Sequence, residues 1–198
     1  MKEFWDSRYA GKQYAYGEHP NAFFKREIQK LKPGKLLLPA EGEGRNAVYA
    51  ATLGWKVTAF DISNEGKRKA LELAKRFNVS IDYRIIPFDQ FNPEAYLYDC
   101  IALIFAHALP VLRSKHHQLV QEWLKPNGTL ILQGFEKSQF GRNSGGPANK
   151  DMLFERQELL SDFKALDNIT VFEEEAELDE GKFHRGKASL INLTGIKR

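Results

Sequence analysis

One short stretch of the chain, residues 36–46 (LLLPAEGEGRN), narrows the possible folds more than any other. An apolar run that predicts a β-strand leads directly into a glycine-containing turn, and a helical pattern begins immediately afterwards. A second apolar run, residues 56–60, follows and ends on Asp61. Glycines let backbone N–H groups approach a ligand, and an acid at the tip of the next strand can accept hydrogen bonds from both hydroxyls of a ribose. The stretch therefore predicts a strand–loop–helix–strand unit that binds an adenosine-containing cofactor.

Apolar runs and helical patterns alternate along most of the chain. Between these runs, apolar side chains at helical spacing predict helices; Ser63 is a candidate N-cap for one of them, and residues 126–128 (PNG) end another. Strands that are joined through helices form a parallel sheet with helices on both faces. The strands are expected at residues 35–39, 56–60, 81–85, 99–105 and 129–135.

The last part of the chain breaks this alternation. After a short helix near residues 155–163, two strand-like runs at 169–175 and 188–196 flank the polar stretch 179–182, which predicts a hairpin. The expected fold is therefore α/β, with a seven-stranded, mostly parallel sheet that ends in an antiparallel hairpin and with helices on both faces.

We expect the 198 residues to form a single domain, which is long enough for a good core without disulfides or metals. Residues 1–34 would form an N-terminal cover segment and helix, and residues 35–135 the cofactor-binding core. Residues 136–154 would form a loop on the substrate side, and residues 155–198 a helix and the hairpin. Long polar loops within compact domains are often lids or binding loops, which is our interpretation of residues 139–149.

Composition excludes several classes of function. Basic and acidic side chains number 29 and 26, are interspersed and give a net charge of +3, so nothing indicates a nucleic-acid partner. Cys100 is the only cysteine, which excludes an intramolecular disulfide and a thiolate metal cluster, and its apolar surroundings predict a buried core residue. No signal-peptide core or membrane-length apolar run is present, so we expect a cytoplasmic protein without a membrane partner. The oligomeric state is not indicated.

The glycine loop alone does not identify the cofactor. Residues 42–47 fit G-x-G-x-x-A, a pattern shared by nicotinamide, flavin and S-adenosylmethionine sites. A nicotinamide-dependent dehydrogenase usually has a further parallel strand and a substrate domain, whereas this chain ends in the expected hairpin. An NAD(P)-binding oxidoreductase therefore stays open only as the alternative.

Short motifs recur in order along nearly the full length of the chain. They are residues 5–9 (WDSRY), 16–21 (YGEHPN), 42–46 (GEGRN), 61–63 (DIS), Asp89, 105–107 (FAH), 124–128 (LKPNG) and 145–147 (GGP) leading to 152–153 (ML). In this order the chain resembles the class I S-adenosylmethionine-dependent methyltransferases, which are Rossmann-like. Within them it looks like the small-molecule branch that includes tellurite-resistance-type and thiopurine-type enzymes.

The resemblance implies that S-adenosylmethionine is the cofactor and that its methyl group passes by in-line displacement to a small-molecule acceptor, such as a thiol or a metalloid. Gly42 and Gly44 would bring the backbone against the cofactor, Asp61 would hold the ribose and Ile62 would lie along the adenine. The other cofactor contacts that it implies are Tyr16, Ala40, Arg45, Asp89, Phe105 and Ala106.

The sequence indicates less clearly which residues bind the methyl acceptor. His107 follows an expected strand and is the only candidate general base, with a structural role as the alternative; Tyr14 and Arg142 are further substrate-side candidates. His116 and His117 fall on a helix beside charged residues, where we expect solvated surface rather than a metal site.

One departure from the family pattern lies in the glycine loop. Leu38 and Ala40 stand where the family usually has an acid and a glycine, although Glu41 or Glu43 can compensate. This departure keeps a third hypothesis open, a protein that binds S-adenosylmethionine without transferring its methyl group.

Overall fold

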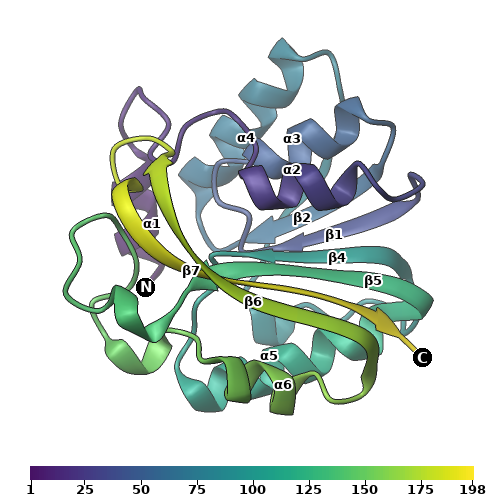
Figure 1. The fold of residues 1–198 in the computed structure, drawn as a ribbon. Helices are drawn as coiled ribbons and strands as arrows, with labels where there is room; N and C mark the ends of the chain where they lie inside the picture. The colour runs from purple at the N-terminus through teal and green to yellow at the C-terminus, as the bar shows by residue number, and fades with distance from the viewer.

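The computed structural model describes all 198 residues, which form a layer of helices on each face of one sheet (Figure 1). The strand order is β3-β2-β1-β4-β5-β7-β6, parallel from β3 to β5 and antiparallel for β7 and β6. The predicted α/β class and the antiparallel hairpin at the end of the sheet are thereby confirmed. The strands are β1 (Lys35–Pro39), β2 (Lys56–Asp61), β3 (Asp82–Ile85), β4 (Tyr98–Ile104), β5 (Leu124–Phe135), β6 (Leu166–Asp179) and β7 (Arg185–Lys197).

Helices α2, α3 and α4 cover one face of the sheet and helices α5 and α6 cover the other, while α1 packs against α4 beside the hairpin tip (Figure 1). The helices are α1 (Lys2–Tyr9), α2 (Ala22–Ile28), α3 (Arg45–Thr52), α4 (Asn64–Arg76), α5 (Pro110–Trp123) and α6 (Arg156–Asp162). Three short 3-10 turns complete the chain, η1 (Phe88–Gln90), η2 (Lys137–Gln139) and η3 (Lys150–Met152).

The two core layers follow from the alternation of side chains along each strand. Leu36 and Leu38 of β1 belong to the cluster under α2 and α3, and Leu37 belongs to the cluster on the α5 side. All three leucines are buried. Cys100 is also buried, as predicted, and this burial raises the pKa of its thiol.

The predicted elements and the observed ones differ mainly at their ends. Ser63 caps α4 as predicted, because its hydroxyl accepts a hydrogen bond from the N–H of Gly66. Helix α1 was not predicted, since the sequence there shows aromatic and charged residues without a clear apolar face. No helix of the molecule combines the length and the apolar character needed to cross a membrane.

Candidate active site

Strands β1, β2 and β4 are parallel, so their carboxyl ends lie at the same edge of the sheet, where the residues that follow them also lie. In parallel α/β sheets, ligands bind outside the carboxyl ends of the strands. Two residues here adopt the left-handed backbone conformation, Ala40 with φ 52° and Phe105 with φ 55°. We call this region the cofactor crevice and define it by the glycine loop (residues 40–44), Asp61, Ile62, η1 and Phe105.

Asp61 is held at the tip of β2 by backbone groups. Its Oδ2 accepts from the N–H of Gly42 at 3.0 Å and its Oδ1 from the N–H of Ser63 at 2.9 Å. Burial raises the pKa of Asp61, although these backbone hydrogen bonds work in the opposite direction. A carboxylate has about four lone-pair sites, so acceptors remain for ribose hydroxyls. The geometry therefore fits the ribose role that the sequence predicts.

Neither glycine of the loop leaves room for a side chain. A Cβ on Gly42 would lie 2.7 Å from the Tyr9 hydroxyl, and a Cβ on Gly44 would lie 2.4 Å from the Cβ of Ala70 in α4. Both glycines have positive φ, 63° and 84°. Gly44 is thus needed for the packing of α4 against the loop, a constraint independent of any ligand.

Glu41 connects the glycine loop to the start of α3. Its Oε1 accepts from the N–H groups of Asn46 and Ala47 at 2.8 Å each, at the start of α3. Burial raises the pKa of Glu41 to about 7 despite these hydrogen bonds. Ala40, which stands where the family usually has a glycine, is exposed, so its methyl group is not part of the buried core.

A buried ion pair connects the glycine loop to residues 10–21, the part of the N-terminal region between α1 and α2, to which we restrict the name cover segment from here on. Glu43 and Lys69 are 4% and 2% exposed, and Lys69 Nζ donates to Glu43 Oε1 at 2.7 Å. Lys69 Nζ also donates to the carbonyl of Gln13 at 2.7 Å, and Glu43 Oε2 accepts from the N–H of Ala15 at 2.7 Å. The cover segment is therefore fixed to the loop and to α4 by charged groups.

Arg45 joins the cover segment to the hairpin. Its guanidinium donates to the carbonyl of Tyr16 at 3.0 Å and to Glu180 Oε2 at 2.9 Å. We predicted that Arg45 contacts the cofactor; in the structure two of its guanidinium nitrogens are engaged by these two partners. The ring of Tyr16 faces the His184 ring, with the two centroids 4.4 Å apart.

The structure argues against the prediction that His107 is a general base. Its Nδ1 lies 2.8 Å from the carbonyl of Met152, and its Nε2 accepts from the N–H of Phe135 at 3.0 Å. Burial lowers the pKa of His107 to about 4, so the ring is neutral at pH 7. Because the lone pair that a base needs is already engaged, His107 joins the ends of two segments rather than accepting a proton.

Two other substrate-side predictions fall outside the crevice. The Tyr14 hydroxyl donates to the carbonyl of Lys69 on α4, and Arg142 pairs with Glu175 of β6 at 2.7 Å. Neither contact places the residue beside Phe105. Of the remaining cofactor predictions, Asp89 is exposed in η1, and Ile62 and Ala106 are half-buried at the crevice edge.

The prediction that His116 and His117 form solvated surface is wrong for His117, and His116 is half-buried. His117 is 1% exposed, and its Nδ1 lies 2.8 Å from Asp162, which also accepts from Arg113. The ring of His116 stacks on Phe88 with centroids 3.8 Å apart. Helix α5 packs this side against α6 and η1, which the local sequence did not indicate.

His184 is the residue that the sequence reasoning missed. It is 6% exposed, and its ring lies 4.4 Å from Phe105 and 5.1 Å from Phe135 between centroids. Its Nδ1 has no hydrogen-bond partner and lies 3.6 Å from Glu180 Oε2. We interpreted this part of the hairpin only as a turn; a histidine four residues after an acid was the available signal.

The sequence matches the family described as Tellurite resistance protein TehB over residues 4–120, which is more than half of the chain. The chain belongs to the TehB family. It is therefore an S-adenosylmethionine-dependent methyltransferase, and S-adenosylmethionine is its cofactor, as predicted. No curated protein matches the sequence.

Solved structures agree with the fold of this TehB-family chain. TehB from Haemophilus influenzae has a TM-score of 0.75 and 17% identity, covering 100% of this chain and 67% of that one. A structure reported for the conversion of a disulfide bond into a thioacetal group during echinomycin biosynthesis has a TM-score of 0.76 and 14% identity, covering 100% and 92%. The N-methyltransferase NodS from Bradyrhizobium japonicum WM9 has a TM-score of 0.65 and 14% identity, covering 89% and 98%.

Proposed function

We propose that this TehB-family methyltransferase acts on a small molecule whose nucleophilic atom is soft and already deprotonated, such as a thiolate or a metalloid anion. S-adenosylmethionine supplies an activated methyl group on a good leaving group. The chain's own residues then have to align the two reactants and exclude water.

The observation that carries this proposal is the low basicity of the groups that lie near Phe105, because burial lowers the pKa of both His184 and His107. The Nε2 lone pair of His107 is engaged by a backbone N–H. Burial raises the pKa of Glu180, but His184 and Arg45 outweigh this effect and lower it to about 2. A carboxylate of such low basicity, bonded to Arg45 and Asn21, is a poor proton acceptor. An acceptor that arrives as an anion needs no such group.

The aromatic lining supports the same choice of acceptor. Phe105 and Phe135 lie 4.8 Å apart between ring centroids, and both rings contact His184. Such walls exclude water and favour polarisable atoms over strongly hydrated ones. The family description concerns tellurite, and one similar structure concerns a disulfide, so both neighbours involve chalcogen chemistry.

The proposal is tested with a panel of acceptors and the purified protein. Thiols, selenite and tellurite are expected to be methylated, whereas phenols and alkylamines of similar size are not. The rate should follow the ionisation of the thiol and show no further pH dependence from a basic group of the protein between pH 6 and 9. Preferred methylation of an amine or a phenol would contradict the proposal.

Calorimetry separates failure of the acceptor assignment from failure of cofactor binding. S-adenosylhomocysteine should bind and NAD(H) should not, and Asp61→Ala should weaken S-adenosylhomocysteine binding by about tenfold or more, since charged hydrogen bonds contribute about 1.5–3 kcal/mol. Binding without turnover on any acceptor would instead support a protein that binds the cofactor without transferring its methyl group.

A further inference from the structure

A groove of about 900 Å3 lies between α1, the cover segment and the tip of the hairpin. No residue of the cofactor crevice lines it. Its aromatic residues are Phe4, Tyr14 and Phe183, and its charged residues are Glu3, Arg8, Lys12 and Lys182. The groove is therefore a second concave surface, rich in rings and in positive charge.

Arg8 is exceptional among the arginines of this chain. Every other arginine has a carboxylate oxygen within 4.0 Å, and Arg8 has none. Its Nη1 donates to the Tyr16 hydroxyl at 3.0 Å, and its guanidinium carbon lies 3.9 Å from the centre of the Phe183 ring and 4.9 Å from that of Phe4. A guanidinium has five N–H donors, so most of them remain available. Arg8 is thus held in place without a counter-charge.

Two more cations of the groove lack a carboxylate partner. Neither Lys12 nor Lys182 forms an ion pair, and Lys182 Nζ lies 5.4 Å from the centre of the Phe183 ring. Glu3 is the only acid in the lining and forms no ion pair either. Three cations against one acid give the groove a net positive charge, which attracts anions.

We propose that this groove binds a planar organic anion, with its negative group on Arg8 and its ring against the aromatic side chains. Guanidinium groups bind carboxylates and phosphates through paired N–H donors, and flat rings stack on aromatic walls. The volume is in the range of small-molecule sites, about 300–1,000 Å3, and an inorganic oxyanion would fill only a small part of it. Because Arg8 donates to the Tyr16 hydroxyl and the Tyr16 ring faces His184, the charged group of the ligand would lie close to Tyr16, on the side of the groove nearest His184.

The test is direct binding and requires no methyl transfer. Phenyl phosphate serves as the probe, with phenol as the ring without the charge and inorganic phosphate as the charge without the ring. Saturation-transfer NMR or calorimetry should give saturable binding of phenyl phosphate that is about tenfold tighter than that of either control, because only phenyl phosphate offers both a ring that stacks and a charged hydrogen-bond acceptor. Raising the salt concentration should weaken it.

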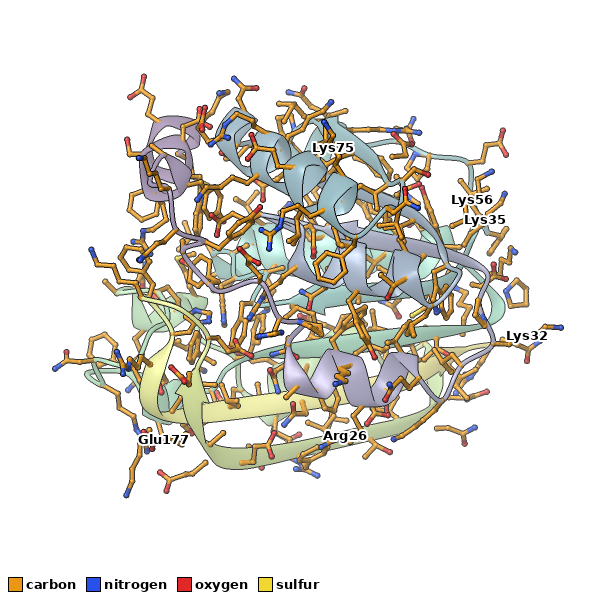
Figure 2. The ribbon with its side chains drawn as sticks, turned by 90° about the horizontal axis from the view of Figure 1, so that it is seen from above. Arg26, Lys32, Lys35, Lys56, Lys75 and Glu177 are labelled. Carbon is orange, nitrogen blue, oxygen red and sulfur yellow. The ribbon has the colours of Figure 1, made fainter.

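Substitutions of single residues show whether phenyl phosphate binds in this groove. Arg8→Gln should weaken phenyl phosphate binding about tenfold, and Lys182→Gln, at an exposed position, about threefold, the latter by screened attraction alone. Lys56→Gln is the matched control, because Lys56 is also exposed and lies beside Lys35, at the opposite end of the molecule from the tip of the hairpin (Figure 2). If Arg8→Gln is unstable, Lys182→Gln still decides the result.

Three outcomes would overturn the proposal. The first is absence of saturable binding to the unaltered protein. The second is equal weakening by Lys56→Gln, which would indicate a general charge effect. The third is displacement of phenyl phosphate by S-adenosylhomocysteine, which would assign Arg8 to the cofactor.

Discussion

Removal of the buried Lys69 ammonium should destabilise the whole protein, because Glu43 would be left as an uncompensated charge in the core. The two side chains are 2% and 4% exposed and lie 2.7 Å apart. Breaking a buried pair by removing one partner costs about 3–5 kcal/mol. For a chain of this length, each kcal/mol lowers the Tm by about 2–4 °C. Lys69→Met should therefore lower the Tm by about 6–20 °C.

The loss should depend on pH and on Glu43. Burial raises the pKa of Glu43, and removal of the ammonium would raise it further. A carboxyl group with a raised pKa favours the folded state when protonated, so the penalty of Lys69→Met should grow as the pH rises from 5 to 8. Glu43→Gln in the same chain removes the buried charge and should restore most of the lost stability, since neutral replacement of both partners is often well tolerated.

Urea unfolding of the four proteins of this double-mutant cycle at pH 5 and pH 8 measures each term. Lys75→Met is the matched control, because Lys75 is on the same helix but is exposed and unpaired, and it should change the free energy of unfolding by no more than about 0.5 kcal/mol. A cost below about 1 kcal/mol for Lys69→Met at pH 8, or no recovery on adding Glu43→Gln, would refute the reasoning.

Three more substitutions test other parts of the site. His107→Gln should cost about 1–2 kcal/mol of stability at pH 7 and leave the pH profile of kcat unchanged, whereas loss of the low-pH limb of that profile would restore His107 as a base. The stability that neutral His107 gives is present above pH 6.5 and lost as the pH falls towards its pKa of about 4, so the variant should lose less on acidification. Because the pKa of Glu180 is lowered to about 2, the unaltered protein should lose stability as the pH falls from 4.5 to about 2. Glu180→Gln should lose less over that range, which thermal melts measure. Ala40→Gly should raise the free energy of unfolding by about 0.5 kcal/mol, the balance of relieved strain and added chain entropy; an unchanged or lower urea midpoint would contradict this.

Local sequence patterns predicted most elements of the fold. The apolar run of residues 35–39, the Ser63 cap and the alternation of strands and helices each have a short-range cause, and the structure confirms them. Crossovers between parallel strands have the same hand in almost all sheets, but this regularity does not determine the strand order, which the sequence left open. The ends of the strands depend on pairing partners, so β6 and β7 extend further than their apolar runs indicate.

The contacts at the site that the sequence did not indicate have a long-range cause. The roles of Arg45, His107 and His117 depend on groups far away in the chain, namely Glu180, Phe135 and Asp162. No local pattern indicates such pairings, because each partner lies in an element whose position is fixed only by the complete sheet. His184 was missed for the same reason, since its aromatic neighbours come from the ends of β4 and β5 and from the cover segment.

The unusual glycine loop is explained by the carboxylates that follow it. Leu38 is a core residue of β1 and supplies no charge to the loop. Glu41 instead binds the start of α3, and Glu43 binds the cover segment and Lys69, so the two acids fix the loop from both sides. In the family pattern, an acid at the end of β1 would orient the glycine loop from within the sheet. Here the same task is divided between two loop residues, and one of them connects the cofactor crevice to the segment that covers it. The loop that departs from the family pattern is thus supported by other groups, and Lys69, on a helix outside the motif, is one of them.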